Sequence, residues 1–110
     1  MMYREPSDSP WGLVVRCDTL FPGVYSVSTA GHGGIMVQTD AARRLLSPEA
    51  QAVGFQAGRY LNFEEDCDAP VVLRELVDSG IIAPRTDNYL RPGEYEACID
   101  RSLQRWNPAY

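Results

Sequence analysis

A glycine-rich turn between two extended segments most constrains the fold of this 110-residue chain. Residues 24–29 (VYSVST) alternate apolar and polar side chains, which is typical of a strand with one buried face. Residues 30–34 (AGHGG) hold three glycines, and residues 35–38 (IMVQ) resume an extended pattern. Glycine tolerates the backbone of a tight turn. The sequence therefore predicts a hairpin and, with a further strand over residues 11–17, a three-stranded antiparallel meander.

Helical patterns follow these strands. Thr39 is the expected N-cap of a first helix, and residues 47–49 (SPE) place a cap, a proline and an acid in the order that begins a second helical turn. Residues 58–63 (GRYLNF) are typical of a fourth strand. Asp68 is the expected cap of another helix over residues 69–79, which carry an apolar stripe at helical spacing.

The order of these elements predicts the fold class. A last helix is expected to begin near Pro92 and to stop at residues 107–108 (NP), because proline cannot continue a helix. Strands precede helices, which favours an α+β fold with a small antiparallel sheet of three to four strands packed against two to three helices. The length suits a single domain, residues 1–110. We expect residues 1–9 to form a polar N-terminal tail and residues 83–91 to connect to the C-terminal helix.

Charge and composition argue against several classes of function. The net charge is −5 and all ten basic residues are arginines, so direct nucleic-acid binding is not expected and lysine chemistry is excluded. No stretch approaches the roughly 18 apolar residues of a membrane span, and the N-terminus shows no apolar signal sequence. We expect no membrane association and a location in the cytoplasm. Cys17, Cys67 and Cys98 are expected to be free thiols, and no cofactor is expected.

The strongest functional signal is an acidic cluster at residues 64–68 (EEDCD), directly before the helix expected over residues 69–79. A helix N-terminus stabilises negative charge, but one capping side chain and one acid in the first turn would satisfy that need. The four carboxylates of the cluster exceed this requirement. The surplus must be solvated, paired with the chain's own arginines, or offered to a basic partner.

An enzymatic alternative can be built from the lone histidine and the thiol of the cluster. In that interpretation Cys67 is the nucleophile, His32 is the general base, and Asp66 or Asp68 orients the imidazole. A metal site is a further alternative, with His32, Cys67 and one or two of Glu64, Glu65, Asp66 and Asp68 as ligands, although their spacing matches no structural zinc motif. The nearby carboxylates weigh against catalysis, because they raise the pKa of a thiol. A structural alternative is that the glycines serve only the turn and that His32 forms hydrogen bonds across it.

Two motifs resemble those of an uncharacterised domain family found in bacterial mobile elements, plasmids and phages. That family pairs a (V/I)STxxHGGI segment with a YEEDCDW segment, and here residues 27–35 read VSTAGHGGI and residues 60–68 read YLNFEEDCD. Residues 10–12 (PWG) and 22–24 (PGV) match two further family positions. Ala69 stands where the family often has an aromatic residue. The resemblance implies a setting in which small proteins counter host defence by binding a protein target.

These observations favour a small acidic protein-binding module over an enzyme. The expected partner is a protein with a basic groove, and the resemblance implies an inhibitor of a host defence protein, of the anti-CRISPR or anti-restriction kind. Trp106 lies beyond the expected core, where an aromatic ring can anchor a partner. The sequence leaves the oligomeric state open. The predicted partner-binding residues are Glu64, Glu65, Asp66, Asp68, His32 and Trp106. The alternative is a cysteine-dependent or metal-assisted enzyme that uses His32, Cys67 and Asp66.

Overall fold

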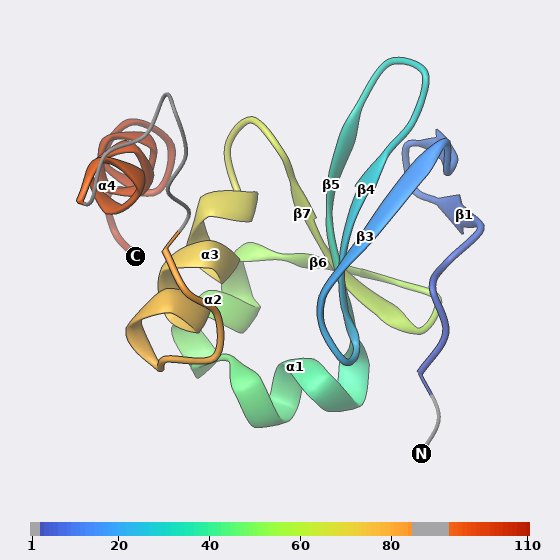
Figure 1. Ribbon diagram of the computed structural model, residues 1–110, viewed down its shortest axis with the longest axis horizontal. Coiled ribbons are helices and arrows are strands. Elements are labelled where there is room, and N and C mark those ends of the chain that lie inside the picture. Colours follow the sequence, from blue (N-terminus) through green and yellow to red (C-terminus); the bar gives the residue numbers. More distant parts are fainter. Residues whose placement is uncertain (1–2, 85–92) are drawn as a thin grey trace.

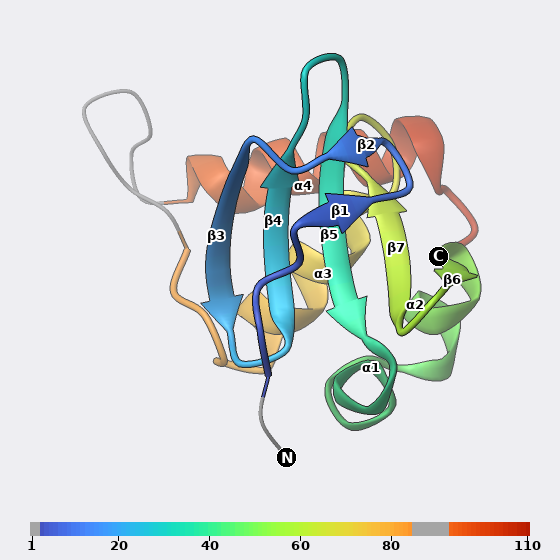
Figure 2. The same cartoon turned by 90° about the vertical axis from the view of Figure 1, so that its right-hand side faces the viewer.

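The computed structural model describes residues 3–84 and 93–110. The strands in this part of the chain are β1 (Asp8–Ser9), β2 (Gly12–Leu13), β3 (Arg16–Phe21), β4 (Val24–Ser28), β5 (Gly33–Gln38), β6 (Phe55–Ala57) and β7 (Tyr60–Glu64). The helices are α1 (Thr39–Leu45), α2 (Pro48–Val53), α3 (Ala69–Asp78) and α4 (Glu94–Trp106). β1 and β2 form a small sheet, and the main antiparallel sheet has the order β3-β4-β5-β7-β6 (Figures 1 and 2). The α+β class is confirmed, with five strands in the main sheet and four helices in the described residues, more than predicted.

The extra strands lack the alternation that sequence patterns detect. β6 is exposed along its whole length, and it joins the sheet only as the hairpin partner of β7, across a turn at Gly58 with a φ of 59°. The strand predicted over residues 11–17 is divided between β2 and β3. β3 continues through Asp18 to Phe21, and the turn that follows has its left-handed residue at Gly23, with a φ of 90°.

Both faces of the main sheet are covered. Successive side chains of a strand point to opposite faces, so neighbouring residues of β4 and β5 enter two different cores. The core between the sheet and the helices includes the strand residues Val24, Ile35, Val37, Leu61 and Phe63. The core on the opposite face comprises Tyr25, Val27 and Met36, which pack against Tyr3, Trp11 and Val14. The N-terminal segment therefore covers the sheet face that the helices leave free.

The residues expected to form a polar tail are attached to the domain where the structure describes them. The hydroxyl of Tyr3 donates a hydrogen bond to Asp40 Oδ2 at 2.7 Å and accepts one from Arg44 Nη2 at 2.5 Å. Further along, β1 pairs with β2. These contacts tie the N-terminal segment to α1 and to the covered face of the sheet, and polar composition alone did not indicate them.

Of the three predicted helix caps, one is wrong, one is correct in position only, and one is confirmed. α1 begins at Thr39 itself, and the Thr39 hydroxyl donates to the carbonyl of Arg59 at 3.0 Å. Asp68 occupies the N-cap position of α3, but its side chain makes no capping hydrogen bond. The cap of α2 is confirmed, because Ser47 accepts a hydrogen bond from the amide of Ala50 at 3.1 Å.

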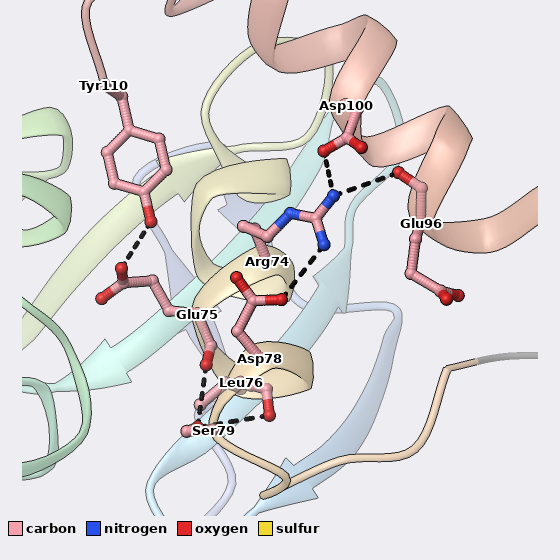
Figure 3. A network of polar contacts seen from close by, with 8 residues as sticks. All are labelled: Arg74, Glu75, Leu76, Asp78, Ser79, Glu96, Asp100 and Tyr110. Carbon is pink, nitrogen blue, oxygen red and sulfur yellow. Dashed lines mark hydrogen bonds and ion pairs between the residues drawn. The ribbon is translucent and has the colours of Figure 1, made fainter. Parts of the chain in front are cut away.

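Helix α4 packs on the outer side of α3, and one arginine bonds the two helices to each other (Figures 1 and 3). Arg74 of α3 forms an ion pair with Asp78 at 3.1 Å, a second with Asp100 of α4, and a hydrogen bond to the carbonyl of Glu96 at 3.4 Å. The predicted helix start at Pro92 and the predicted connection from residue 85 onward lie outside the described residues. None of the described helices is long and apolar enough to cross a membrane.

Candidate functional site

The acidic residues comprise Glu64 at the end of β7 and the short connection from it to α3, and residues 64–68 are here called the acidic loop. Backbone hydrogen bonds close it: the amide of Asp68 donates to the carbonyl of Glu64 at 2.9 Å, and the amide of Glu65 donates to Gly33 of β5 at 3.1 Å. Glu65 and Asp66 are exposed, whereas Glu64 and Asp68 are half-buried. The loop thus presents carboxylates to solvent from a fixed position at the end of the sheet.

β4 and β5 form a hairpin whose turn carries His32, here called the histidine hairpin. The pairing of β5 with β7 brings this hairpin to the same end of the sheet as the acidic loop (Figure 2). Gly34, two residues after His32, lies opposite Glu64 in the register of these strands. Thr29 closes the hairpin, because its amide and its hydroxyl each donate to the His32 carbonyl at 2.7 Å. The imidazole of His32 is exposed and forms no hydrogen bond to a described residue. The backbone of His32 therefore serves the turn, while its side chain faces solvent.

The motif glycines have a different purpose from the one predicted. Gly33 and Gly34 belong to β5, and neither they nor Gly31 has a positive φ. A Cβ atom on Gly33 would lie 2.4 Å from the carbonyl oxygen of Val27, and one on Gly34 would lie 2.5 Å from Cη2 of Trp11. These two glycines are needed because neighbouring strands and an aromatic ring approach too closely for a side chain, not because the turn needs left-handed residues.

Cys67 is poorly suited to act as a nucleophile. Burial raises the pKa of its thiol above the ordinary 9.0, and the charges of Asp68 and Glu64 raise it further. The thiol therefore stays protonated at neutral pH, whereas thiolate is the reactive form. Among residues 3–84 and 93–110, no three His, Cys, Asp or Glu side chains are grouped so that they can hold a metal ion. The arrangement gives no support to the cysteine-dependent or the metal-assisted alternative.

Asn107 is a site residue that sequence analysis missed. Its Nδ2 donates to the carbonyl of Cys67 at 2.8 Å and to Oδ1 of Asp68 at 3.2 Å, which links the end of α4 to the acidic loop. Asp68 is thus bonded to a residue 39 positions away instead of capping its own helix. Residues 107–108 carried only a helix-stop signal in the sequence, so nothing pointed to this long-range contact.

The carboxylates of the acidic loop have no arginine partner in the described part of the chain. The ion pairs found there join Arg16 to Asp18 and Arg74 to Asp78 and Asp100. None of them includes a residue of the acidic loop. The surplus negative charge inferred from the sequence is therefore not neutralised by any described arginine.

A groove of about 660 Å³ lies beside the acidic loop. Its lining comes from β3, β4 and β5 on the sheet side, and from α3, residues 82–83 and Tyr95 of α4 on the other side. Glu65 belongs to both the acidic loop and the lining of this groove, and Asp18 of β3 contributes a second carboxylate. None of its described lining residues is an arginine or a histidine. We call it the sheet-edge groove.

Trp106, the remaining predicted partner-binding residue, is the last residue of α4 and is 50% exposed. The guanidinium of Arg105 lies 5.0 Å from the centre of its ring. Trp106 lines a separate hollow of about 320 Å³ with Val53 and Pro108. Its neighbour Asn107 contacts the acidic loop, but Trp106 does not line the sheet-edge groove.

The comparisons with known proteins place the whole site in one family. Neither the search of curated proteins nor that of solved structures gave a match. The family model described as Domain of unknown function (DUF7007) matches residues 4–110, a range that includes the histidine hairpin, the acidic loop and α4. The chain therefore belongs to the DUF7007 family.

Proposed function

We propose that this domain is an acidic protein-binding module that uses the acidic loop to bind a basic surface of a protein partner. The observation that carries the proposal is the unpaired state of the loop. Four carboxylates lie within five residues at one end of the sheet, and no described arginine forms an ion pair with them. Like charges held this close repel one another, and a basic partner relieves that repulsion.

The physical form of the loop suits recognition. Its backbone is held by β5 on one side and by Asn107 on the other, so the carboxylates are arranged before a partner arrives. Preorganised groups lose less conformational entropy on binding. Complementary charge accelerates association and makes it sensitive to salt. His32 and Glu65 lie in adjacent connections and enlarge the same polar surface.

The class of partner follows from the resemblance to mobile-element and phage proteins. We propose a host defence protein, such as a CRISPR or restriction component, whose arginine- or lysine-rich groove normally holds nucleic acid. Carboxylates on a small domain imitate the phosphates that such a groove binds. In this proposal the domain acts by occupying the groove and not by chemistry, and the raised pKa of Cys67 is consistent with that role.

A capture experiment with matched charge variants tests the proposal. The double variant Glu65→Gln/Asp66→Asn removes two exposed carboxylates of the loop, and Glu49→Gln/Glu94→Gln removes two exposed carboxylates elsewhere. The immobilised proteins are incubated with bacterial lysate at low and at high salt. We expect a partner that the wild type and the Glu49/Glu94 variant retain at low salt, and that the loop variant loses. Equal retention by both variants, or retention that is insensitive to salt, would contradict the proposal.

A further inference from the structure

The sheet-edge groove combines an acidic lining with an apolar one. Asp18 and Glu65 contribute carboxylates, and Ser26 and Ser28 contribute hydroxyl groups that can accept hydrogen bonds. Asp18 forms an ion pair with Arg16, but both side chains are exposed, with 57% and 75% of their surface accessible. The carboxylate of Asp18 therefore stays available to a ligand. An exposed pair of this kind contributes little and exchanges easily.

The opposite wall of the groove is apolar. Leu73 of α3 and Ile82 line it, and Ile35 of β5 contributes to its floor. A long basic side chain matches such a lining, because its methylene stem packs on apolar surface while its charged head remains near carboxylates. Arginine fits better than lysine, since its guanidinium is weakly hydrated and presents a planar fork of donors that two carboxylate oxygens can accept.

The groove also reaches the edge strand of the main sheet. β3 is the terminal strand of the main sheet and pairs with β4 alone among the described strands. Asp18, Thr19 and Leu20 of β3 all line the groove. An extended peptide beside β3 can form backbone hydrogen bonds with this edge, and every second side chain of such a peptide faces the same side of the sheet.

From these observations we propose that the sheet-edge groove receives an extended, arginine-bearing segment of the protein partner. A guanidinium of that segment faces the carboxylates of Asp18 and Glu65. The inference deepens the proposed function and rests on it, because Glu65 belongs to both the acidic loop and the groove. It adds the chemistry of the recognised residue and the backbone conformation of the segment that carries it.

The test is a titration of the ¹⁵N-labelled protein with the peptide acetyl-Thr-Arg-Thr-Arg-Thr-amide, followed by amide chemical shifts. A second peptide with citrulline at both arginine positions has the same shape without the charge. We expect the arginine peptide to shift the amides of Ser26, Ser28 and Leu73, and the citrulline peptide to bind at least about tenfold more weakly.

Variants then assign the contact. Asp18→Asn and Glu65→Gln should each weaken binding of the arginine peptide by about three- to tenfold. Glu49→Gln makes the same type of charge change in the other hollow and should change the affinity by less than about twofold. These residues are exposed or line open hollows, so the dispersion of the amide spectrum should be retained and should show that each variant is folded.

Two results would overturn the inference. One is equal binding of the arginine and citrulline peptides. Another is an equal loss of affinity in Asp66→Asn and Glu65→Gln. That result would place the peptide on the acidic loop and outside the groove, and it would leave the proposed function intact. Failure of the lysate capture with normal peptide binding would instead reject the proposed function.

Discussion

Replacing Gly34 with alanine should strongly destabilise the domain, although the change adds only one methyl group. The new Cβ would lie 2.3 Å from the carbonyl oxygen of Phe63 and 2.5 Å from Cη2 of Trp11. Real Cβ atoms essentially never approach another heavy atom within 3.0 Å. The ring of Trp11 can rotate away, but the Phe63 carbonyl belongs to β7, which pairs with β5 at this position. Relief of the clash must therefore separate two central strands.

The magnitude follows from what must move. Separation from 2.3 Å to 3.0 Å is a shift of 0.7 Å across the β5–β7 pair, enough to weaken one or two ladder hydrogen bonds worth about 0.5–1.5 kcal/mol each. Displacement of Trp11 also disturbs its edge-to-face contact with Phe55, whose ring centre lies 6.2 Å away, at a cost of about 0.5–1.5 kcal/mol. The reduced entropy of the unfolded chain offsets about 0.4–1 kcal/mol. We expect a net loss of about 2 kcal/mol, within the range for overpacked cores.

The assay is urea unfolding followed by far-ultraviolet circular dichroism, which does not depend on the environment of Trp11. With a slope of about 1–3 kcal/mol per molar urea, the midpoint of Gly34→Ala should fall by about 1–2 M. Gly31→Ala is the matched control, because a Cβ on Gly31 meets no atom within 4 Å and its φ is not positive. Unfolding midpoints that agree within about 0.3 M for the two variants would refute the view that close strand packing requires the second motif glycine.

Three further predictions address the helices and the thiol. Arg74→Met should lower the free energy of unfolding by about 1–2 kcal/mol, because it removes the ion pair to Asp100 and the hydrogen bond to Glu96 on α4, together with the ion pair to Asp78 within α3; an unchanged urea midpoint would show that these ion pairs contribute nothing. Burial and the hydrogen bond to Glu75 raise the pKa of Tyr110 well above its ordinary 10.0, so the unfolded chain loses this proton first and stability should fall as pH rises above about 10. Tyr110→Phe should lose less stability than the wild type between neutral and alkaline pH. Melting temperatures that fall equally with pH in the two proteins would contradict this prediction. Iodoacetamide should modify Cys67 at neutral pH more slowly than a free model thiol, because burial raises its pKa. Peptide mapping against Cys67→Ser gives this rate, and a faster rate would revive the enzymatic alternative.

Local patterns predicted the elements whose signals are local. The alternation of β4, the apolar stripe of α3 and the serine cap of α2 each arise within a few residues, so the sequence indicated them correctly. β6 was missed because its residues are all exposed and only pairing with β7 makes them a strand. Asp68 was placed correctly at the N-cap of α3, but its backbone is in the αR region and its carboxylate accepts a hydrogen bond from Asn107 instead of capping the helix.

The candidate site was likewise predictable from the sequence only in its composition and not in its contacts. The surplus of carboxylates in residues 64–68 was evident from composition, since charge is a property of the residues themselves. Whether an arginine neutralised that charge depended on contacts between distant segments, which the sequence does not order. Only the tertiary structure placed Glu65 beside Gly33, brought Asn107 to the acidic loop and opened a groove between Asp18 and Leu73. Such contacts are decided by the packing of strands and helices far apart in the chain, and no residue pattern encodes them locally.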